Sequence, residues 1–143
     1  RFEKRFIAQK FIKGEEVTCG VLHGPKRVLA LPPVHVTFSA TSFLDYDNNY
    51  LTGVQKFTTP VPFPEEVIST IQTTSLRAHR ALNCSGASRT DMIWDGKRLW
   101  VLEIETLPSM LADSAFAQMT QAAGVSFPDL LSHLIQSASP KLA

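Results

Sequence analysis

Three acidic residues in two strand-like segments are spaced so that they could share one cation. Glu103 and Glu105 are two residues apart, so both side chains point to the same face of a β-strand. Asp91 lies in the preceding segment, and the turn sequence DGKR between the two segments is typical of a hairpin. A three-residue loop would place Asp91 opposite Val101 and diagonal to Glu103, about 7–8 Å away on the same face. A two-residue turn would point Asp91 to the other face.

Arg89 joins these acids in the three-residue register, where it lies opposite Glu103. Carboxylate oxygens are the hard ligands that Mg²⁺ prefers, and a guanidinium suits phosphate. Spacing alone also fits a solvated charged strand face, which is the commoner arrangement. The segment from Thr106 to Ser114 then leads into a helix start, where backbone N–H groups can bind an anion. A capped loop without a ligand also explains that segment.

The elements that carry these residues predict an α+β fold, with a mostly antiparallel sheet and helices packed on it. Helices are predicted from Pro64 to Asn83, from Ser114 to about Ala123, and onward from Ser126. Residues 40–62 hold turn formers and aromatics without a steady period and predict a long loop. Strands are predicted over residues 15–22, 27–31, 34–38, 87–94 and 99–105, and residues 6–12 are predicted to form a short strand or the end of one.

Length and composition narrow the class of protein. The 143 residues fit one domain, residues 1–143, and a net charge of +1 argues against a nucleic-acid or membrane-surface module. The apolar runs fall short of the roughly 20 residues that span a bilayer. Cys19 and Cys84 imply no disulfide framework, so a reducing, cytoplasmic location is expected. The chain begins at Arg1 without Met, which suggests a piece of a longer protein.

A family resemblance extends over essentially the whole chain. The segment SGASRTDMIWDGKRLWVLEIETLPSM resembles the metal-binding stretch of D-alanine–D-alanine ligases, where an Arg-x-Asp strand precedes Glu-x-Asn-Thr-x-Pro-Gly-Met. Upstream, FIAQKFIKGEEVTCGVL resembles the family's strand–Gly–Glu segment and ALPPVHV its next strand. The stretch FLDYDNNYLTG is similar to the loop that closes over the family's active site. The resemblance implies the C-terminal part of an ATP-grasp ligase, whose N-terminal and central parts lie outside this chain.

The resemblance also implies a reaction and its site. Such a ligase uses ATP and two Mg²⁺ ions, or Mn²⁺ instead, to activate one D-alanine as an acyl phosphate. The amine of a second D-alanine then attacks it, as a step of peptidoglycan synthesis. The implied partners are these substrates and the missing N-terminal portion, and a homodimer is compatible with the resemblance. For the nucleotide, the resemblance places Lys10, Phe11 and Ile12 beside adenine and Glu16 at the ribose. For the metal and phosphate, it assigns Asp91, Glu103 and Glu105 as metal ligands and Arg89 to phosphate and the reacting carboxyl. For the substrate, it implies that Tyr50 closes the site, Ser109 lies by the oxyanion and Ser114 binds a substrate carboxylate.

Several positions depart from the family pattern and leave three functions open. Glu105 stands in place of Asn, Ser109 in place of Gly, and Asn49 in place of the Lys before Tyr50. The chain is expected to serve a D-alanine–D-alanine ligase that is active only with its missing portion. The alternatives are an impaired ligase-like domain kept for binding or assembly, and an ATP-grasp ligase for a different acid and amine. Alone, the chain is expected to be inactive.

Overall fold

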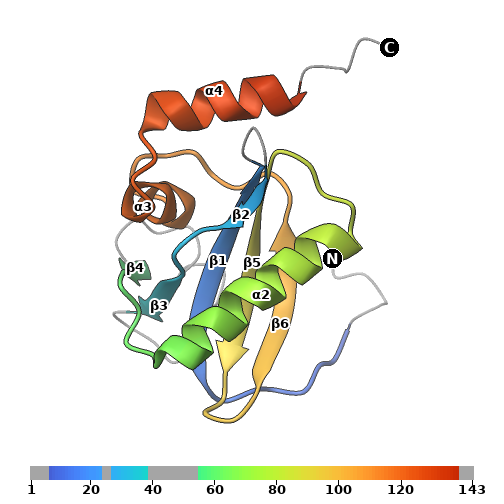
Figure 1. The fold of residues 1–143 in the computed structure, drawn as a ribbon. Coiled ribbons are helices and arrows are strands. Elements are labelled where there is room, and N and C mark those ends of the chain that lie inside the picture. Colours follow the sequence, from blue (N-terminus) through green and yellow to red (C-terminus); the bar gives the residue numbers. More distant parts are fainter. Residues whose placement is uncertain (1–6, 24–26, 39–54, 139–143) are drawn as a thin grey trace, which may run out of the picture.

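One antiparallel sheet organises the computed structural model, which describes residues 7–23, 27–38 and 55–138 (Figure 1). The strand order is β4-β3-β1-β5-β6, and β2 pairs with the end of β1. The predicted α+β class with an antiparallel sheet is therefore confirmed. The elements are β1 (Glu15–His23), β2 (Val28–Ala30), β3 (Val34–Phe38), β4 (Gln55–Thr58), α2 (Glu65–Ala81), β5 (Ala87–Trp94), β6 (Leu99–Glu105), α3 (Ala115–Ala122) and α4 (Phe127–Ala138).

Helices cover both faces of the sheet, and strand alternation assigns each side chain to one of them. Helix α2 crosses one face of the sheet (Figure 1). On that face Val17 and Met92 form a core with Ile71. Helices α3 and α4 pack at one end of the other face, where Leu22 joins a core around Phe116. The part of this second face that α3 and α4 leave uncovered carries the acidic residues described below.

The helix starts follow local capping chemistry, as predicted. Helix α2 begins after Pro64 with two glutamates in its first turn, where negative charge suits the helix dipole. Ser114 caps α3 by accepting a hydrogen bond from Ala117 N at 3.2 Å. Ser126 caps α4 through Asp129, accepting from its backbone N and donating to its carboxylate.

Two sequence predictions are wrong. The described part of the segment 6–12, residues 7–12, forms no strand, and its Ile7 and Phe11 side chains are exposed. An alternation of charged and apolar residues is a weak signal for a strand, because a strand also needs the edge of a neighbouring strand with which to pair. Conversely, residues 55–58 of the predicted 40–62 loop form β4, with Val36 opposite Phe57. This short strand forms because it pairs with the edge of β3. The sequence of residues 55–58 alone does not specify that pairing.

Within the described ranges, none of the helices has the combination of length and apolar composition needed to cross a membrane.

Candidate active site

A bulge in the β5–β6 hairpin brings the predicted acids to one face. Trp94 pairs with Leu99, so the turn has four residues, not three, and the expected pairing of Asp91 with Val101 is wrong. A four-residue turn alone would place Asp91 opposite Leu102 and point it away from the glutamates. The register shifts by one residue between Asp91 and Met92, and this irregularity restores the common face.

The resulting pairs differ from the predicted register but place the charges closer together. Asp91 lies directly opposite Glu103, and Arg89 lies opposite Glu105 rather than opposite Glu103. Directly opposed residues have Cβ atoms about 4.5–5.5 Å apart, closer than the diagonal spacing expected. On the other side of β5, Thr18 of β1 is the Cα partner of Asp91. The four charged side chains thus lie in two adjacent rows across β5 and β6.

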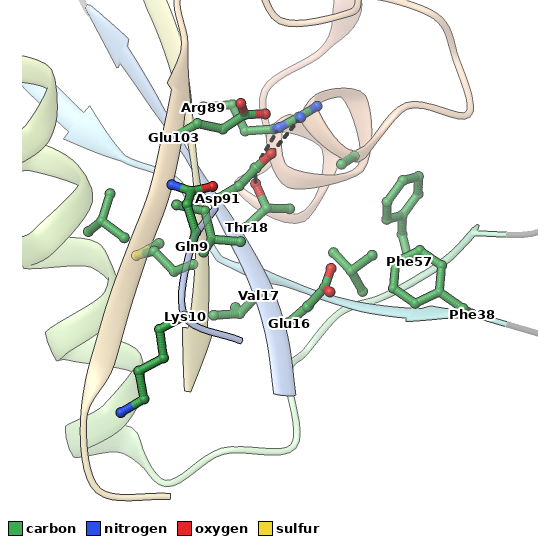
Figure 2. Close-up of a pocket in the computed structure, with 15 residues that line it drawn as sticks. Gln9, Lys10, Glu16, Val17, Thr18, Phe38, Phe57, Arg89, Asp91 and Glu103 are labelled. Atoms are coloured by element: carbon green, nitrogen blue, oxygen red, sulfur yellow. Dashed lines mark hydrogen bonds and ion pairs between the residues drawn. The ribbon is translucent and has the colours of Figure 1, made fainter. Parts of the chain in front are cut away.

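Arg89, Asp91 and Glu103 line a cleft of about 700 Å³ on the part of the sheet face that α3 and α4 leave uncovered (Figure 2). One wall is polar, with Arg89, Asp91 and Glu103 on β5 and β6. The opposite wall is apolar and belongs to β3 and β4. Its side chains are Val36, Phe38 and Phe57. Glu16 and Thr18 of β1 lie between the walls, Gln9 and Lys10 contribute from the segment before β1, and Ala115 contributes from the start of α3.

Arg89 is the electrostatic centre of the polar wall. Its Nε and Nη2 donate to the two carboxylate oxygens of Asp91, each at 2.9 Å. Its Nη1 lies 3.0 Å from Glu105 Oε2 without hydrogen-bond alignment, so that contact is one of charge. Burial alone would lower the pKa of Arg89, but hydrogen bonding and charge from Asp91, with charge from Glu105 and Glu103, raise it above its ordinary value.

Glu16 has a perturbed carboxyl in the same cleft. Its pKa is raised, first because burial disfavours the charged form and second because the negative charge of Asp91 lies near. The charged form of Glu16 is therefore less favourable here than the charged form of an isolated surface carboxylate. A cation or a hydrogen-bond donor that enters the cleft would relieve this cost.

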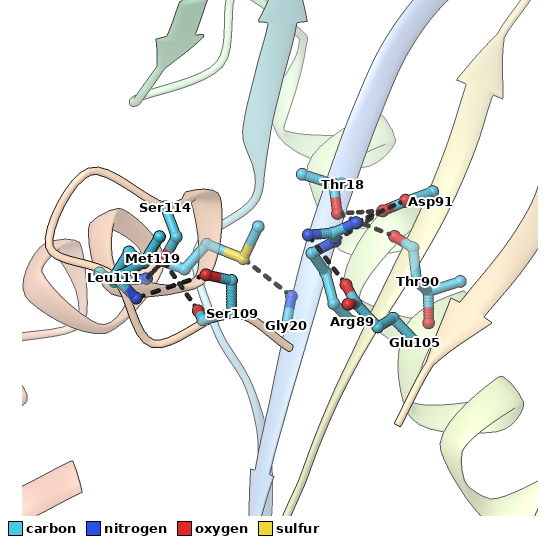
Figure 3. Close-up of polar contacts among 11 residues, drawn as sticks. Thr18, Gly20, Arg89, Thr90, Asp91, Glu105, Ser109, Leu111, Ser114 and Met119 are labelled. Carbon is cyan, nitrogen blue, oxygen red and sulfur yellow. Dashed lines mark hydrogen bonds and ion pairs between the residues drawn. The ribbon is translucent and has the colours of Figure 1, made fainter. Parts of the chain in front are cut away.

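The loop before α3 forms its own hydrogen-bond network, which Figure 3 shows facing β1. The Ser114 hydroxyl donates to the Ser109 carbonyl oxygen at 2.8 Å while it accepts from Ala117 N. Ser109 Oγ in turn accepts from Leu111 N at 3.4 Å. The single proton of the Ser114 hydroxyl is therefore committed within the loop, and it must change partner before it can donate to a substrate carboxylate.

The acidic residues suit Mg²⁺ that is bound together with a nucleotide. In the part of the chain that the structure describes, no three His, Cys, Asp or Glu side chains form a metal cage by themselves. Mg²⁺ usually takes one or two carboxylates plus substrate phosphates and water, so Asp91 and Glu103 suffice as protein ligands. Among the described residues, Glu105 Oε2 is buried without a hydrogen-bond partner, and its neighbour is Arg89 Nη1 at 3.0 Å. The three-ligand set stays a prediction.

The structure brings most of the predicted site residues together. Lys10, Glu16, Arg89, Asp91 and Glu103 line the one cleft, and Glu105 adjoins it through Arg89. The predicted residues that do not line it are Phe11, Ile12, Ser109 and Ser114, and Tyr50 and Asn49 lie outside the described residues.

Sequence reasoning missed Thr18 and the apolar wall. Thr18 is two residues from Glu16 in an alternating strand, so the same periodicity that placed the acids could have assigned it to this face. The apolar wall had no such signal, because Phe57 belongs to β4, which was predicted to be loop. Its pairing with Val36 brings it to the cleft.

Comparison with known proteins identifies the family. Residues 1–136 match the family model described as D-ala D-ala ligase C-terminus. The chain belongs to the D-alanine–D-alanine ligase family. It is similar to the D-alanine–D-alanine ligase of Desulforudis audaxviator, with 39% identity over 137 residues, which is 96% of this chain and 44% of that protein. The ligase of Syntrophobacter fumaroxidans is 37% identical over 139 residues, with 96% and 44% covered.

Solved structures of the same family share the fold of this chain. The D-alanine–D-alanine ligase from Bacillus anthracis complexed with ATP matches with a TM-score of 0.73 and 29% identity, covering 90% of this chain and 39% of that one. The VanG D-Ala:D-Ser ligase from Enterococcus faecalis matches with a TM-score of 0.74 and 30% identity, covering 89% and 37%. The chain therefore spans less than half the length of the ligases it matches, and the family predicted from its sequence is confirmed.

Proposed function

We propose that the full-length protein containing this ligase chain joins D-alanine to D-alanine in peptidoglycan synthesis, using ATP and Mg²⁺ in the cytoplasm. The observation that carries the proposal is the cleft in which Arg89, Asp91 and Glu103 face an apolar wall. Relatives named D-alanine–D-alanine ligase support the choice of substrates. This chain would supply the metal-binding and second-substrate part of the active site. The missing N-terminal portion would supply the rest, including the pocket for the first D-alanine.

Phosphoryl transfer to a carboxylate requires positioning of the reactants and neutralisation of phosphate charge more than a single base. Arg89 suits this role, because its partners hold the guanidinium in place and favour its charged form. Asp91 and Glu103 would hold Mg²⁺, which when bound neutralises charge on the phosphates. Val36 and Phe57 line the opposite side with apolar atoms, which would limit water there and strengthen the charge interactions inside the cleft.

The two ends of the cleft would take different parts of the reactants. Glu16 and Lys10 line it near β1, where the nucleotide would bind with Phe11 and Ile12 close to the base. At the start of α3, backbone N–H groups and the Ser114 hydroxyl would receive the carboxylate of the second D-alanine. That step requires Ser114 to release the Ser109 carbonyl oxygen.

Phosphate release by the full-length protein, measured with ATP, Mg²⁺ and D-alanine, tests the proposal. Release is expected to require D-alanine, with D-alanyl-D-alanine as the product. Arg89→Gln is expected to lower kcat by about 10²–10³-fold, the typical cost of removing one preorganised charge stabiliser. Arg98→Gln is the matched control, because Arg98 lies over the Trp100 ring in the exposed hairpin turn. Equal activity of the two variants would count against the role of Arg89.

Ser109 supports a second candidate, a ligase for a different amine. Its side chain binds the backbone of its own loop at the substrate end, where the family pattern has Gly. The VanG neighbour is named a D-Ala:D-Ser ligase, so acceptor identity differs within matching structures. A screen of D-amino acids and D-hydroxy acids as second substrates separates the two functions by product mass. If the full-length protein binds neither nucleotide nor Mg²⁺, the alternative of an impaired ligase-like domain kept for binding or assembly replaces both.

A further inference from the structure

The hydrogen bonds to Asp91 leave only one of its carboxylate oxygens with room for a ligand. Oδ1 accepts from the Thr18 hydroxyl at 2.6 Å and from Arg89 Nε at 2.9 Å. Within the described part of the chain, Oδ2 accepts only from Arg89 Nη2, at 2.9 Å. A carboxylate oxygen has two lone-pair positions, so Oδ1 is saturated and Oδ2 retains one position. The contacts therefore favour binding of a cation through Oδ2 alone.

Thr18 is the more rigid of the two donors. It lies on the central strand β1 with 3% of its surface exposed, and its branched Cβ restricts χ1. Its 2.6 Å contact is in the short range of a hydroxyl donating to a charged carboxylate. Arg89, by contrast, has a long side chain that also contacts Glu105 and is proposed to serve phosphate. Figure 3 shows Thr18 and Arg89 both in contact with Asp91. Thr18 can therefore keep Asp91 oriented if Arg89 turns toward a substrate.

We propose that Thr18 is a positioning residue, which holds the Asp91 carboxylate so that Oδ2 faces the cleft as a one-oxygen ligand for the metal–nucleotide complex. This proposal rests on the function proposed above, since it assigns Asp91 to that complex. In this proposal Thr18 acts through Asp91, whose Oδ1 accepts its hydroxyl proton. Its hydroxyl also lies 3.3 Å from the Thr90 carbonyl oxygen, which offers a second acceptor if Asp91 is replaced.

The chain offers a matched control in Thr90. Thr90 is the β5 residue before Asp91, is fully buried like Thr18, and pairs with Cys19. Its side chain points to the opposite face, and its Oγ1 has no hydrogen-bond partner among the residues that the structure describes. Thr→Val replaces a hydroxyl by a methyl of nearly the same shape at both positions. Only at Thr18 does it remove a hydrogen bond to the proposed ligand.

The test measures binding of Mg²⁺ and a non-hydrolysable ATP analogue to the full-length protein by calorimetry, without D-alanine. Thr18→Val is expected to weaken binding about 10- to 100-fold, the usual effect of losing a partner that orients a metal ligand. Thr90→Val is expected to bind within about twofold of the unaltered protein, because it loses no such partner. Thr18→Ser, which keeps the hydroxyl, is expected to restore most of the affinity.

Two results would overturn the role of Thr18. One is that Thr18→Val binds as tightly as Thr90→Val, and the other is that Thr18→Ser is as impaired as Thr18→Val. Phosphate release by the unaltered protein is measured in parallel and tests the ligase reaction separately. A protein that binds the complex with the predicted variant pattern but releases no phosphate with D-alanine would refute the reaction and support the positioning role. A protein that binds no complex at all would refute both.

Discussion

Gly20 of β1 is a buried position where a single added methyl group should be costly. It is the Cα partner of Arg89, and its backbone N–H donates to Met119 Sδ of α3 at 3.0 Å. An added Cβ would lie 2.9 Å from Leu31 Cδ1, 2.9 Å from Phe116 Cε2 and 3.1 Å from Met119 Sδ. All three neighbours are buried, so none can move into solvent to make room. Glycine here permits α3 to approach the sheet closely.

The magnitude for Gly20→Ala follows from these contacts. Carbon atoms pack best at about 3.5–4.0 Å, so the neighbours must retreat by roughly 0.5–1 Å. Overpacking of this kind typically costs about 1–3 kcal/mol. The lower entropy of alanine in the unfolded chain offsets about 0.4–1 kcal/mol. The expected loss in the free energy of unfolding is therefore about 1–2 kcal/mol.

Urea unfolding of the full-length protein measures this loss, and a double-mutant cycle identifies its cause. Leu31→Ala removes one of the atoms that the new Cβ would meet. Gly20→Ala should therefore cost at least about 0.5 kcal/mol less in that background, within the range found for residues in contact. The reasoning would be refuted if Gly20→Ala were as stable as the unaltered protein. It would equally be refuted if its cost were the same in both backgrounds.

Three further outcomes are expected. Alkylation of the native protein, mapped by mass spectrometry, should label the partly exposed Cys84 but not Cys19. Cys19 is protected because it is buried, and burial raises its pKa to about 12. Early labelling of Cys19 would contradict this. Burial, and then the neighbouring His23, lower the pKa of His79 below its ordinary 6.5. The unfolded chain therefore binds a proton that the folded chain resists, so stability should fall as pH drops below about 6.5. His79→Gln should flatten this dependence in urea unfolding at pH 7.5 and 5.0, and an unchanged slope would exclude His79 as the cause. Glu105→Asn should change the free energy of unfolding by less than about 1 kcal/mol. The reason is that the ion pair of Glu105 with Arg89 lacks hydrogen-bond alignment and 38% of the Glu105 side chain is exposed. A loss above about 2 kcal/mol would show that this ion pair is stronger than expected.

Local sequence patterns determined the chemistry and most of the elements. Strand alternation placed Glu103 and Glu105 on one face, because a period of two is a property of the extended backbone itself. Ser114 and Pro64 marked helix starts for the same kind of reason, since capping involves only neighbouring residues. The residue types around Arg89 were sufficient to suggest an anion and metal site in the family they resemble.

Tertiary structure alone decided how those residues meet. Asp91 shares a face with the glutamates only because a β-bulge compensates for a four-residue turn, and a shift of one residue reverses every side chain. Thr18 reaches Asp91 across 73 positions of sequence, through the pairing of β1 with β5. Phe57 completes the apolar wall because β3 has an edge for β4 to join. Register, bulges and edge pairing depend on contacts between distant segments, and the period of a single segment does not specify them.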